Sequence, residues 1–296
     1  ISESAPHSAG SPNAASPADN PPISAYIRTL NEERQIAEVV TAALQAAREV
    51  VIVDSGSTDA TCALAEAAGA RVYAQSWLGN GGQKRAAEER CAHDWLLDLD
   101  ADEIVTARLA AEIRALFAEG EPPLSAYRLT LVTEPPIGPA WEGFALDPRA
   151  KFYDRRRHRM PDSKAWDQLE LPRDLAVGAL QGALMHRSFA DFAQYMAKWN
   201  RVSSARASHA RLKSKWDVIA RILFAPPIYF LRHYFLRGLW RAGLYGFCIA
   251  CGVAFGRWMR DVKMYERHRG LHGGVGEGGA GAQKRGVASD TPQKPV

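Results

Sequence analysis

Two clusters of acidic and hydroxyl side chains stand out in the first third of the chain. Residues 54–59 (DSGSTD) and 98–103 (DLDADE) each follow a short apolar run, residues 50–53 and 95–97. Such runs, ending in turn-forming residues, are typical of buried strands in a parallel sheet. Open α/β sheets bind their ligands at the carboxyl ends of strands. We therefore expect both clusters at one ligand-binding edge.

In the second cluster, Asp100 and Asp102 are separated by one residue. This spacing lets one carboxylate contact a sugar hydroxyl while the other holds a divalent cation. Oxygen ligands suit Mg²⁺ or Mn²⁺ bridging a diphosphate, so the pair indicates a nucleotide-diphosphate site. Two alternatives stay open. A DxD pair is common by chance, and acids after a strand often cap the next helix, as Asp59 or Ser57 could for a helix beginning near Ala60.

The elements around these clusters are predicted to alternate between strand and helix, as in an α/β domain. In chain order they are a strand over 23–27, a helix to about 48, a strand over 50–53, a helix over 61–68, a short strand over 71–73, a helix over 85–91, and the strand that reaches Asp100.

This succession closely resembles the nucleotide-binding half of family 2 glycosyltransferases. The resemblance covers about residues 23–190, and four blocks carry it in family order and spacing: residues 29–33 (TLNEE), 53–59 (VDSGSTD), 83–84 (QK) and 99–103 (LDADE). Within the family, the chain is most similar to the lipopolysaccharide-core β-1,4-glucosyltransferases. The resemblance implies the α/β GT-A fold, a mixed and mostly parallel sheet flanked by helices, followed by a basic amphipathic α-helical C-terminal region.

The resemblance also implies an activity and a set of site residues. The activity is a metal-dependent, inverting transfer of a sugar, glucose in the related enzymes, from a UDP-sugar to a lipid-linked saccharide acceptor of the lipopolysaccharide inner core. Asp102 would ligate Mg²⁺ or Mn²⁺. The side chains that would bind the donor are Thr29, Asn31 and Glu32 in the nucleotide pocket, Asp54 at the uracil or ribose, Gln83 and Lys84 over the base, and Asp100 at the ribose.

An inverting transfer needs a carboxylate that takes the proton of the acceptor hydroxyl. The related glucosyltransferases have a Val-His-Glu stretch near the end of the catalytic domain. This chain has Trp166 and Asp167 in place of the His and Glu, so the resemblance implies Asp167 as the base. An Asp carboxylate lies about one methylene nearer the backbone, so the loop must move to compensate. Glu170 and Asp162 are the alternatives.

Three further basic side chains are candidates for phosphate or acceptor contacts. Arg155 and Arg156 lie in the stretch KFYDRRRHR (residues 151–159), which corresponds to a basic stretch of the family. They could clamp a phosphate or belong to a solvated basic loop. His186 matches a family histidine and could contact the diphosphate or make a buried hydrogen bond.

Charge divides the chain into two parts. Residues 1–190 carry 19 Lys and Arg against 27 Asp and Glu, a net charge of −8, whereas residues 191–270 carry 15 against 4, a net charge of +11. The basic part is also rich in Trp, Tyr, Phe and Leu. Basic residues beside large apolar ones on helices are typical of a segment lying in an anionic membrane interface.

We therefore predict a peripheral protein on the cytoplasmic face of the bacterial inner membrane. Packing of the basic segment as ordinary core is the main alternative, and nucleic-acid binding is disfavoured because no nucleic-acid motif appears. Residues 239–255 contain Arg241 and are at the short limit for a membrane span. They therefore either dip into one leaflet or span the whole bilayer. The segment RGLWRAG (residues 237–243) lacks the Asp of a related family block.

Composition sets the predicted domain boundaries. Residues 1–22, rich in Ser, Ala and Pro, should be disordered and lack the apolar core of a signal peptide. Residues 23–190 form the catalytic domain, residues 191–270 the helical membrane-associating region, and residues 271–296 a Gly-rich flexible tail. The four cysteines show no disulfide framework, which favours a reducing cytoplasm.

Two other classes of function remain open. A polyprenyl-phosphate sugar synthase would use the same donor site with a phosphate acceptor, which needs no strong base because its oxygen is already ionised. A sugar-nucleotide-binding protein without catalytic activity could use the same scaffold.

Overall fold

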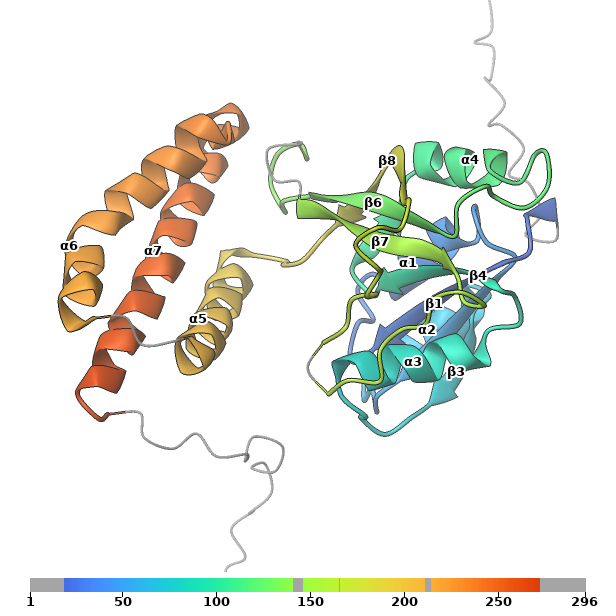
Figure 1. The fold of residues 1–296 in the computed structure, drawn as a ribbon, viewed down its shortest axis with the longest axis horizontal. Coiled ribbons are helices and arrows are strands. Elements are labelled where there is room, and N and C mark those ends of the chain that lie inside the picture. Colours follow the sequence, from blue (N-terminus) through green and yellow to red (C-terminus); the bar gives the residue numbers. More distant parts are fainter. Residues whose placement is uncertain (1–18, 141–145, 165, 211–213, 272–296) are drawn as a thin grey trace, which may run out of the picture. The chain divides into compact units, whose positions relative to one another are not determined.

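The computed structural model describes residues 19–140, 146–164, 166–210 and 214–271 (Figure 1). Most of the predicted disordered segment 1–22 and of the predicted tail 271–296 lies outside the described residues. The chain forms two compact units. The first comprises Ile1–Tyr195 and Arg237–Phe247, and the second Met196–Leu236 and Cys248–Val296.

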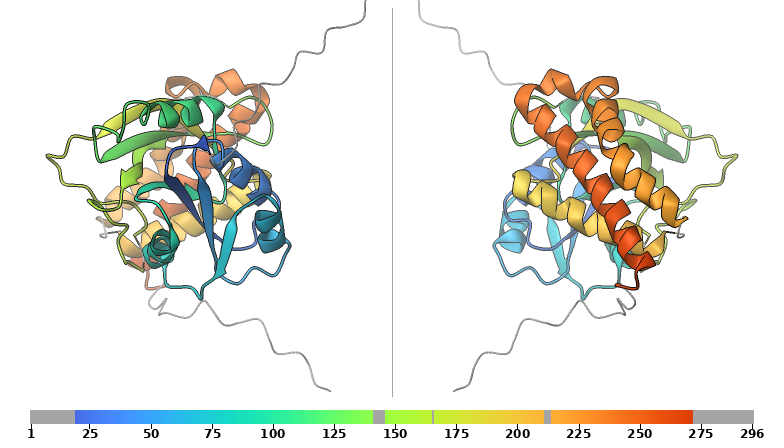
Figure 2. Two further views of the ribbon diagram at one scale, coloured as in Figure 1. Left: turned by 90° about the vertical axis from the view of Figure 1, so that its right-hand side faces the viewer. Right: turned by 90° about the vertical axis from the view of Figure 1, so that its left-hand side faces the viewer.

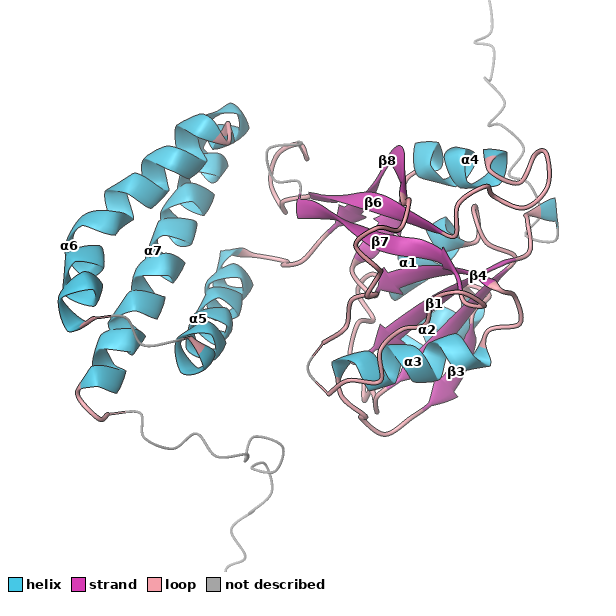
Figure 3. Cartoon of the chain, in the orientation of Figure 1, coloured by secondary structure: helices cyan, strands magenta, loops and turns pink. Residues whose placement is uncertain are grey.

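The first unit holds an eight-stranded mixed sheet with the strand order β3-β2-β1-β4-β7-β6-β8-β5, and Figure 3 shows the strands gathered there. Its strands are β1 (Ile23–Thr29), β2 (Glu49–Asp54), β3 (Arg71–Ala74), β4 (Trp95–Asp100), β5 (Glu103–Val105), β6 (Ala126–Thr133), β7 (Leu146–Asp154) and β8 (Gly178–His186). Its complete helices are α1 (Ile36–Ala43), α2 (Thr61–Ala67), α3 (Asn80–Arg90) and α4 (Ala107–Ala115).

Side chains alternate between the two faces of the sheet, and each face is covered by helices. Ile23 and Ile27 of β1 pack in one apolar cluster with side chains of α1 and α4. Tyr26 points to the other face and packs in a second cluster with Ala87 of α3. Figure 1 shows these helices around the sheet. Two buried faces explain why the strands of this half read as continuous apolar runs.

The parallel strands β1, β2 and β4 end at one edge of the sheet. In the register of β1, Thr29 is opposite Asp54 of β2 and Arg28 is opposite Asp100 of β4. The prediction that two strands bring their acidic clusters to the same edge is therefore confirmed.

Helix α3 begins five residues earlier than predicted, at Asn80 instead of Arg85. The backbone amides of Asn80 and Gly81 donate to the carbonyl oxygens of Lys164 and Ser163, at 3.0 and 2.8 Å. A segment distant in sequence thus satisfies the free amides of the first turn. A Cβ at Gly81 would lie 2.3 Å from the carbonyl oxygen of Trp166, so this contact requires glycine.

Two other helix boundaries also differ from prediction. Helix α1 ends at Ala43, not near residue 48. Helix α2 has Ala60 as its N-cap residue, without a capping bond from its side chain, so neither Asp59 nor Ser57 holds that position. Asp59 still accepts a hydrogen bond from the Thr61 amide at 3.0 Å.

The described part of the second unit is helical. It contains most of α5 (Phe192–His209), α6 (Lys215–Leu231), a π-helical turn (Arg232–Leu236) and most of α7 (Gly243–His268), which follows a 3₁₀ turn (Leu239–Ala242). Figure 2 shows α6 and α7 side by side. Gly256 of α7 packs on Trp199, where a Cβ would come within 2.4 Å of the indole ring. By length and composition alone, one described segment, Leu239–His268, could cross a membrane, and 44% of its most apolar window is buried.

Candidate functional site

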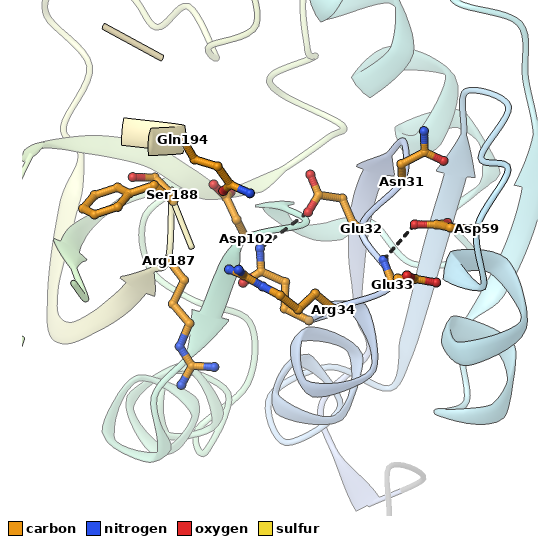
Figure 4. A pocket seen from close by; sticks show the side chains of 11 residues that line it. Asn31, Glu32, Glu33, Arg34, Asp59, Asp102, Arg187, Ser188 and Gln194 are labelled. Atoms are coloured by element: carbon orange, nitrogen blue, oxygen red, sulfur yellow. Dashed lines mark hydrogen bonds between the residues drawn. The ribbon is translucent and has the colours of Figure 1, made fainter. Parts of the chain in front are cut away.

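A polar cavity of about 350 Å³ opens at the edge where β1 and β4 end. It is lined by residues that follow β1, by Asp102, which follows β4, and by residues that follow β8 (Figure 4). The lining side chains are Asn31, Glu32, Glu33, Arg34, Gln35, Asp59, Asp102, Arg187, Ser188, Phe189 and Gln194. The structure thus brings three of the predicted site residues, Asn31, Glu32 and Asp102, to one cavity.

Asp102 is one of four acids that line this cavity. Its Oδ2 lies 3.1 Å from Nε2 of His186, at the end of β8. Figure 4 shows Glu32 beside it, and the Arg187 side chain directed away. Burial and the negative charge of Asp102 raise the pKa of Glu32 above its ordinary value. Two carboxylates that repel each other in this way attract a cation.

The side chains present fit a divalent cation that takes the rest of its ligands from a diphosphate. Asp102 and His186 supply one oxygen and one nitrogen, Oδ2 and Nε2, which lie 3.1 Å apart. Among the described residues, no group of three or more His, Cys, Asp or Glu side chains could hold a metal ion. Mg²⁺ commonly binds through one or two carboxylates together with substrate phosphates.

Behind the cavity, two buried lysines neutralise the acids at the end of β4. Lys84 and Lys151 are each 2% exposed. Nζ of Lys84 lies 2.9 Å from Asp98 and 3.1 Å from Asp100, and Nζ of Lys151 lies 2.8 Å from Glu103. Burial opposes ionisation of Asp100, but Lys84, Lys151 and Arg28 outweigh it, so the pKa of Asp100 lies well below its usual range. Burial, together with Asp100, raises the pKa of Glu103 despite Lys151.

Lys151→Met is expected to lower the free energy of unfolding by about 3–5 kcal/mol near neutral pH, because it leaves buried Glu103 without its ion-pair partner. Burial already raises the pKa of Glu103, and without Lys151 this pKa should rise further. Protonation then stabilises the folded variant, so the loss should shrink towards about pH 5. Urea unfolding of the full chain at both pH values measures this. Lys215→Met, at an exposed lysine, should cost less than about 0.5 kcal/mol. A loss that is equal at both pH values would contradict the account.

Arg28 connects the two predicted catalytic regions. Its Nε lies 3.5 Å from Asp100, and its Nη2 donates to Oδ2 of Asp167 at 2.6 Å. Its Nη1 donates to the carbonyl and side-chain oxygens of Asn80, at 3.0 and 3.1 Å. Asp167 therefore lies on the Asp100 side of the site and does not line the cavity that holds Asp102.

The remaining donor-site candidates mostly support the loops around the site. Asn31 has a φ of 56°, and its Oδ1 accepts from the Thr58 amide at 2.8 Å. Asp54 accepts hydrogen bonds from the next loop, including the Ser57 amide at 2.8 Å. Gln83 is fully buried and donates to Ser55 and to the carbonyl of Gln75. Thr29 is buried, and its Oγ1 has no hydrogen-bond partner among the described residues.

Arg155 and Arg156 lie away from the cavity. β7 is antiparallel to β4, with Asp154 opposite Trp95, so the residues after β7 are near the start of β4 rather than its end. Arg155 donates to the carbonyl of Cys91 at 2.8 Å, and Arg156 forms ion pairs with Asp154 and Glu121. This placement favours the alternative, a basic loop with structural ion pairs, over contact with the diphosphate.

Sequence reasoning gave no individual role to Arg28, Asp98, Lys151 or Glu103, although Asp98 and Glu103 belong to the second acidic cluster and Lys151 begins the basic stretch 151–159. One signal could have found two of them, because an isolated Arg or Lys inside a buried apolar strand needs an acid nearby. Arg28 is within the apolar strand β1, and Lys151 precedes Phe152 and Tyr153 in β7.

Comparison with known proteins gives the chain its family. Residues 24–161 match the family described as Glycosyl transferase family 2. The lipopolysaccharide core biosynthesis glycosyltransferase LpsC of Rhizobium meliloti is 32% identical over 265 residues, which cover 83% of this chain and 93% of that protein. An uncharacterized glycosyltransferase of Rickettsia bellii is 31% identical, covering 82% of this chain and 86% of its own length.

Solved structures are more distant. TarS of S. aureus in complex with UDP-GlcNAc is 14% identical and aligns over 84% of this chain and 92% of that chain, with a TM-score of 0.43. Glucosyl-3-phosphoglycerate synthase of Mycobacterium tuberculosis, in complex with Mn²⁺, UDP and phosphoglyceric acid, is 23% identical over 40% of this chain and 45% of that chain, with a TM-score of 0.31.

The sheet, its flanking helices and the helical C-terminal region agree with the GT-A fold that the resemblance implies. Identity above 30% over more than four fifths of the chain settles the family. The chain belongs to glycosyl transferase family 2 and is a glycosyltransferase related to an enzyme of lipopolysaccharide core biosynthesis.

Proposed function

We propose that this protein is a metal-dependent, inverting transferase that moves a sugar, glucose in the first instance, from a UDP-sugar to a lipid-linked acceptor of the lipopolysaccharide inner core. The observation that carries the proposal is Asp102, which lines a polar cavity beside Glu32 at the carboxyl end of β4 and lies 3.1 Å from His186. In the proposed organisation, residues 23–190 are catalytic and residues 191–270 attach the protein to the membrane.

The donor would lie along the ends of β1, β2 and β4. Thr29 has a buried hydroxyl free to contact a ligand, and Asn31 and Glu32 line the cavity. Asp54, at the end of β2, lies at the same edge of the sheet and would accept a hydrogen bond from the uracil or ribose. Asp100, held ionised by its lysine partners, would accept a hydrogen bond from a ribose hydroxyl.

Gln83 and Lys84 would act from behind the donor. Gln83 is fully buried and Lys84 is 2% exposed, so neither can close over the base without a rearrangement of the site. We propose instead that Gln83 fixes the loops after β2 and β3, and that Lys84 fixes the direction of the Asp100 carboxylate.

Asp102 and His186 would hold Mg²⁺ or Mn²⁺, the choice supported by their oxygen and nitrogen donors. When bound, the cation neutralises charge that develops on the departing diphosphate. Asp102 orients the diphosphate end of the donor, and Glu32 adds negative charge that favours cation binding.

Asp167 would take the proton from the acceptor hydroxyl as that oxygen attacks the anomeric carbon from the side opposite the diphosphate. Its ion pair with Arg28 directs the carboxylate towards the Asp100 side of the site. Arg28 is the positioning residue in this scheme, because it contacts both acids.

Attachment to an anionic membrane surface is supported by an exposed apolar stripe on α6. Trp216, Phe224, Ile228 and Leu231 are between 50% and 76% exposed, and their spacing places Phe224, Ile228 and Leu231 on one helix face. The second unit is also strongly basic. An apolar stripe beside positive charge is typical of a peripheral helix in a membrane interface. We propose the cytoplasmic face of the bacterial inner membrane as its location.

The double variant Trp216→Ser, Phe224→Ser is expected to lose most of the salt-resistant binding to vesicles that contain anionic lipid. Apolar insertion does not depend on ionic strength, whereas each basic side chain contributes on the order of 1 kcal/mol that salt screens. Co-sedimentation of the full chain at low and high salt measures both parts. Trp77→Ser, which removes an exposed Trp of the first unit, should leave binding unchanged. Equal loss from Trp77→Ser would contradict the assignment to α6.

The identity of the acceptor that receives the sugar distinguishes the proposed function from its two alternatives. Full-length protein with UDP-glucose and Mn²⁺ should glycosylate a lipopolysaccharide core precursor and leave polyprenyl phosphate unmodified. Transfer to polyprenyl phosphate alone would favour the synthase class, in which Asp167 remains only a partner of Arg28. UDP binding with no transfer to either acceptor would favour an inactive sugar-nucleotide-binding protein.

A further inference from the structure

Five arginines from four segments of the second unit are linked through two residues: Arg221 and Arg260 pair with Asp261, and the charges of Arg260, Arg206 and Arg232 act on Arg257. They are Arg206 of α5, Arg221 of α6, Arg232 of the π-helical turn, and Arg257 and Arg260 of α7. We call them the arginine cluster. Residues that are distant in sequence and alike in charge do not gather without a cause, because like charges repel each other at short range.

Only two members of the arginine cluster have a carboxylate partner. Asp261 is 2% exposed and lies 3.1 Å from Nη2 of Arg221 and 2.9 Å from Nη2 of Arg260. Within the described ranges, Arg206 and Arg232 form no ion pair, and neither does Arg257. Among the described residues, the five positive charges of the cluster are thus matched by one ion-paired carboxylate, Asp261.

Burial and neighbouring positive charges both act on Arg257. Its guanidinium lies over the ring of Tyr229, 5.4 Å from the centroid, and its Nε is buried without a hydrogen-bond partner among the described residues. Burial lowers the pKa of Arg257 below its ordinary value, and the charges of Arg260, Arg206 and Arg232 lower it further. A buried donor without an acceptor costs free energy, and an anion bound there would remove that cost.

Tyr229 lies beside two members of the cluster, Arg221 and Arg257. Nη2 of Arg221 donates to its hydroxyl oxygen at 3.3 Å. Burial alone would raise the pKa of Tyr229, yet the nearby charges of Arg221, Arg260 and Arg257 outweigh burial, so the pKa lies below its ordinary value. The cluster therefore favours the negatively charged form of any group beside it.

The surroundings indicate which anion fits. Guanidinium groups bind phosphate oxygens through paired N–H donors. The apolar stripe of α6 lies next to the cluster along the chain, since Ile228 and Leu231 flank Tyr229 and Leu231 precedes Arg232. Ile228 and Leu231 are both exposed. A phosphate carried by an apolar chain can use both features, whereas a free phosphate ion uses only the first.

We propose that the arginine cluster is a binding site for the terminal phosphate of a membrane amphiphile, with Arg257 as its central donor. The ligand class is a lipid, or lipid anchor, that carries a phosphate monoester or diphosphate. The inference rests on the proposed function only in taking the acceptor to be lipid-linked. It adds a discrete site that selects exposed phosphate over other anionic headgroups.

Vesicle binding by the full-length protein tests the site without any sugar donor. Vesicles of phosphatidylcholine with phosphatidic acid, which has a phosphate monoester, are compared with phosphatidylcholine vesicles that contain phosphatidylglycerol, a phosphodiester, at matched surface charge. Wild-type protein should bind the phosphatidic acid vesicles about tenfold more tightly. Arg257→Gln should abolish this preference, and Arg257→Lys, which keeps the charge but loses the paired donors, should reduce it.

Arg269→Gln is the matched control, because it removes one positive charge from an exposed residue near the end of the same helix. It should weaken binding to both vesicles alike and keep the preference. Equal wild-type binding to both vesicles at matched charge would overturn the proposal, as would an equal loss of preference in Arg269→Gln. If inorganic phosphate competed as effectively as phosphatidic acid, the claim that the ligand is a lipid would be overturned. A preference for single-stranded RNA over vesicles would overturn the entire proposal. Unchanged melting temperatures show that each variant is folded.

Because no donor is present, failure of the transferase proposal would leave this preference intact. Conversely, if the wild-type protein showed no preference for phosphatidic acid but bound UDP normally, the phosphate site would be rejected and the proposed donor site would be unaffected.

Discussion

Asp102→Asn is expected to lower sugar transfer by roughly 10²–10³-fold. Asn keeps the shape of the side chain but removes the negative charge that pairs with His186 at 3.1 Å and repels Glu32. A site with one carboxylate fewer holds a divalent cation poorly, so charge on the departing diphosphate is no longer neutralised. Turnover of UDP-glucose over a range of Mn²⁺ concentrations measures the effect, and excess Mn²⁺ should recover only part of it.

Asp174→Asn provides the control for this charge change, because Asp174 is exposed and does not line the cavity. It should leave turnover within about twofold of wild type. If Asp102→Asn turned over normally, or if EDTA left wild-type activity unchanged, the metal assignment would be wrong.

Asp167→Asn is expected to reduce kcat by about 10²–10⁴-fold while UDP affinity is kept. The amide can still accept a hydrogen bond from Arg28, which lies 2.6 Å from the carboxylate, but it cannot take a proton. Glu170→Gln is the matched variant, since Glu170 is a nearby exposed acid. Normal turnover in Asp167→Asn with loss in Glu170→Gln would transfer the role to Glu170.

Arg28→Met separates a catalytic role of Asp167 from a structural one. If Asp167 only balanced the charge of Arg28, adding Asp167→Asn to Arg28→Met would change nothing further. If Asp167 is the base, the double variant should lose kcat well beyond Arg28→Met alone. Equal kcat values in the single variant Arg28→Met and the double variant would reject the base assignment.

The sequence was sufficient to predict the edge of the sheet where the acids meet. The apolar runs before Asp54 and Asp98 are strands because both faces of the sheet are covered by helices, and parallel pairing then places their ends together. The resemblance likewise gave the correct family and fold, because its blocks follow the order of these strands.

The interior of the site could not be predicted in the same way. Gln83 and Lys84 were expected to close over the base, and the structure buries both. Their burial depends on contacts that are distant in sequence, such as Lys84 with Asp98 and the first turn of α3 with Ser163. Local pattern does not reveal such contacts. The role of Arg28 could not be predicted for the same reason, since its partner Asp167 is 139 residues away in the sequence.

The arginine cluster shows a further limit of composition. The charge count predicted that residues 191–270 are basic, without indicating which of their charges lie together. In the structure, α6 and α7 place Arg221 and Arg260 around buried Asp261, which concentrates charge at one place on the second unit.

Calorimetric titration of UDP into the full-length protein, with and without Mn²⁺, is the most direct test of the central claim that Asp102 forms a metal-dependent nucleotide-sugar site. The account predicts that Mn²⁺ tightens UDP binding to the wild-type protein by about tenfold or more and that Asp102→Asn removes this gain while keeping the weak metal-free binding. Mn²⁺-independent UDP affinity in the wild type, or an equal Mn²⁺ effect in Asp102→Asn, would contradict it.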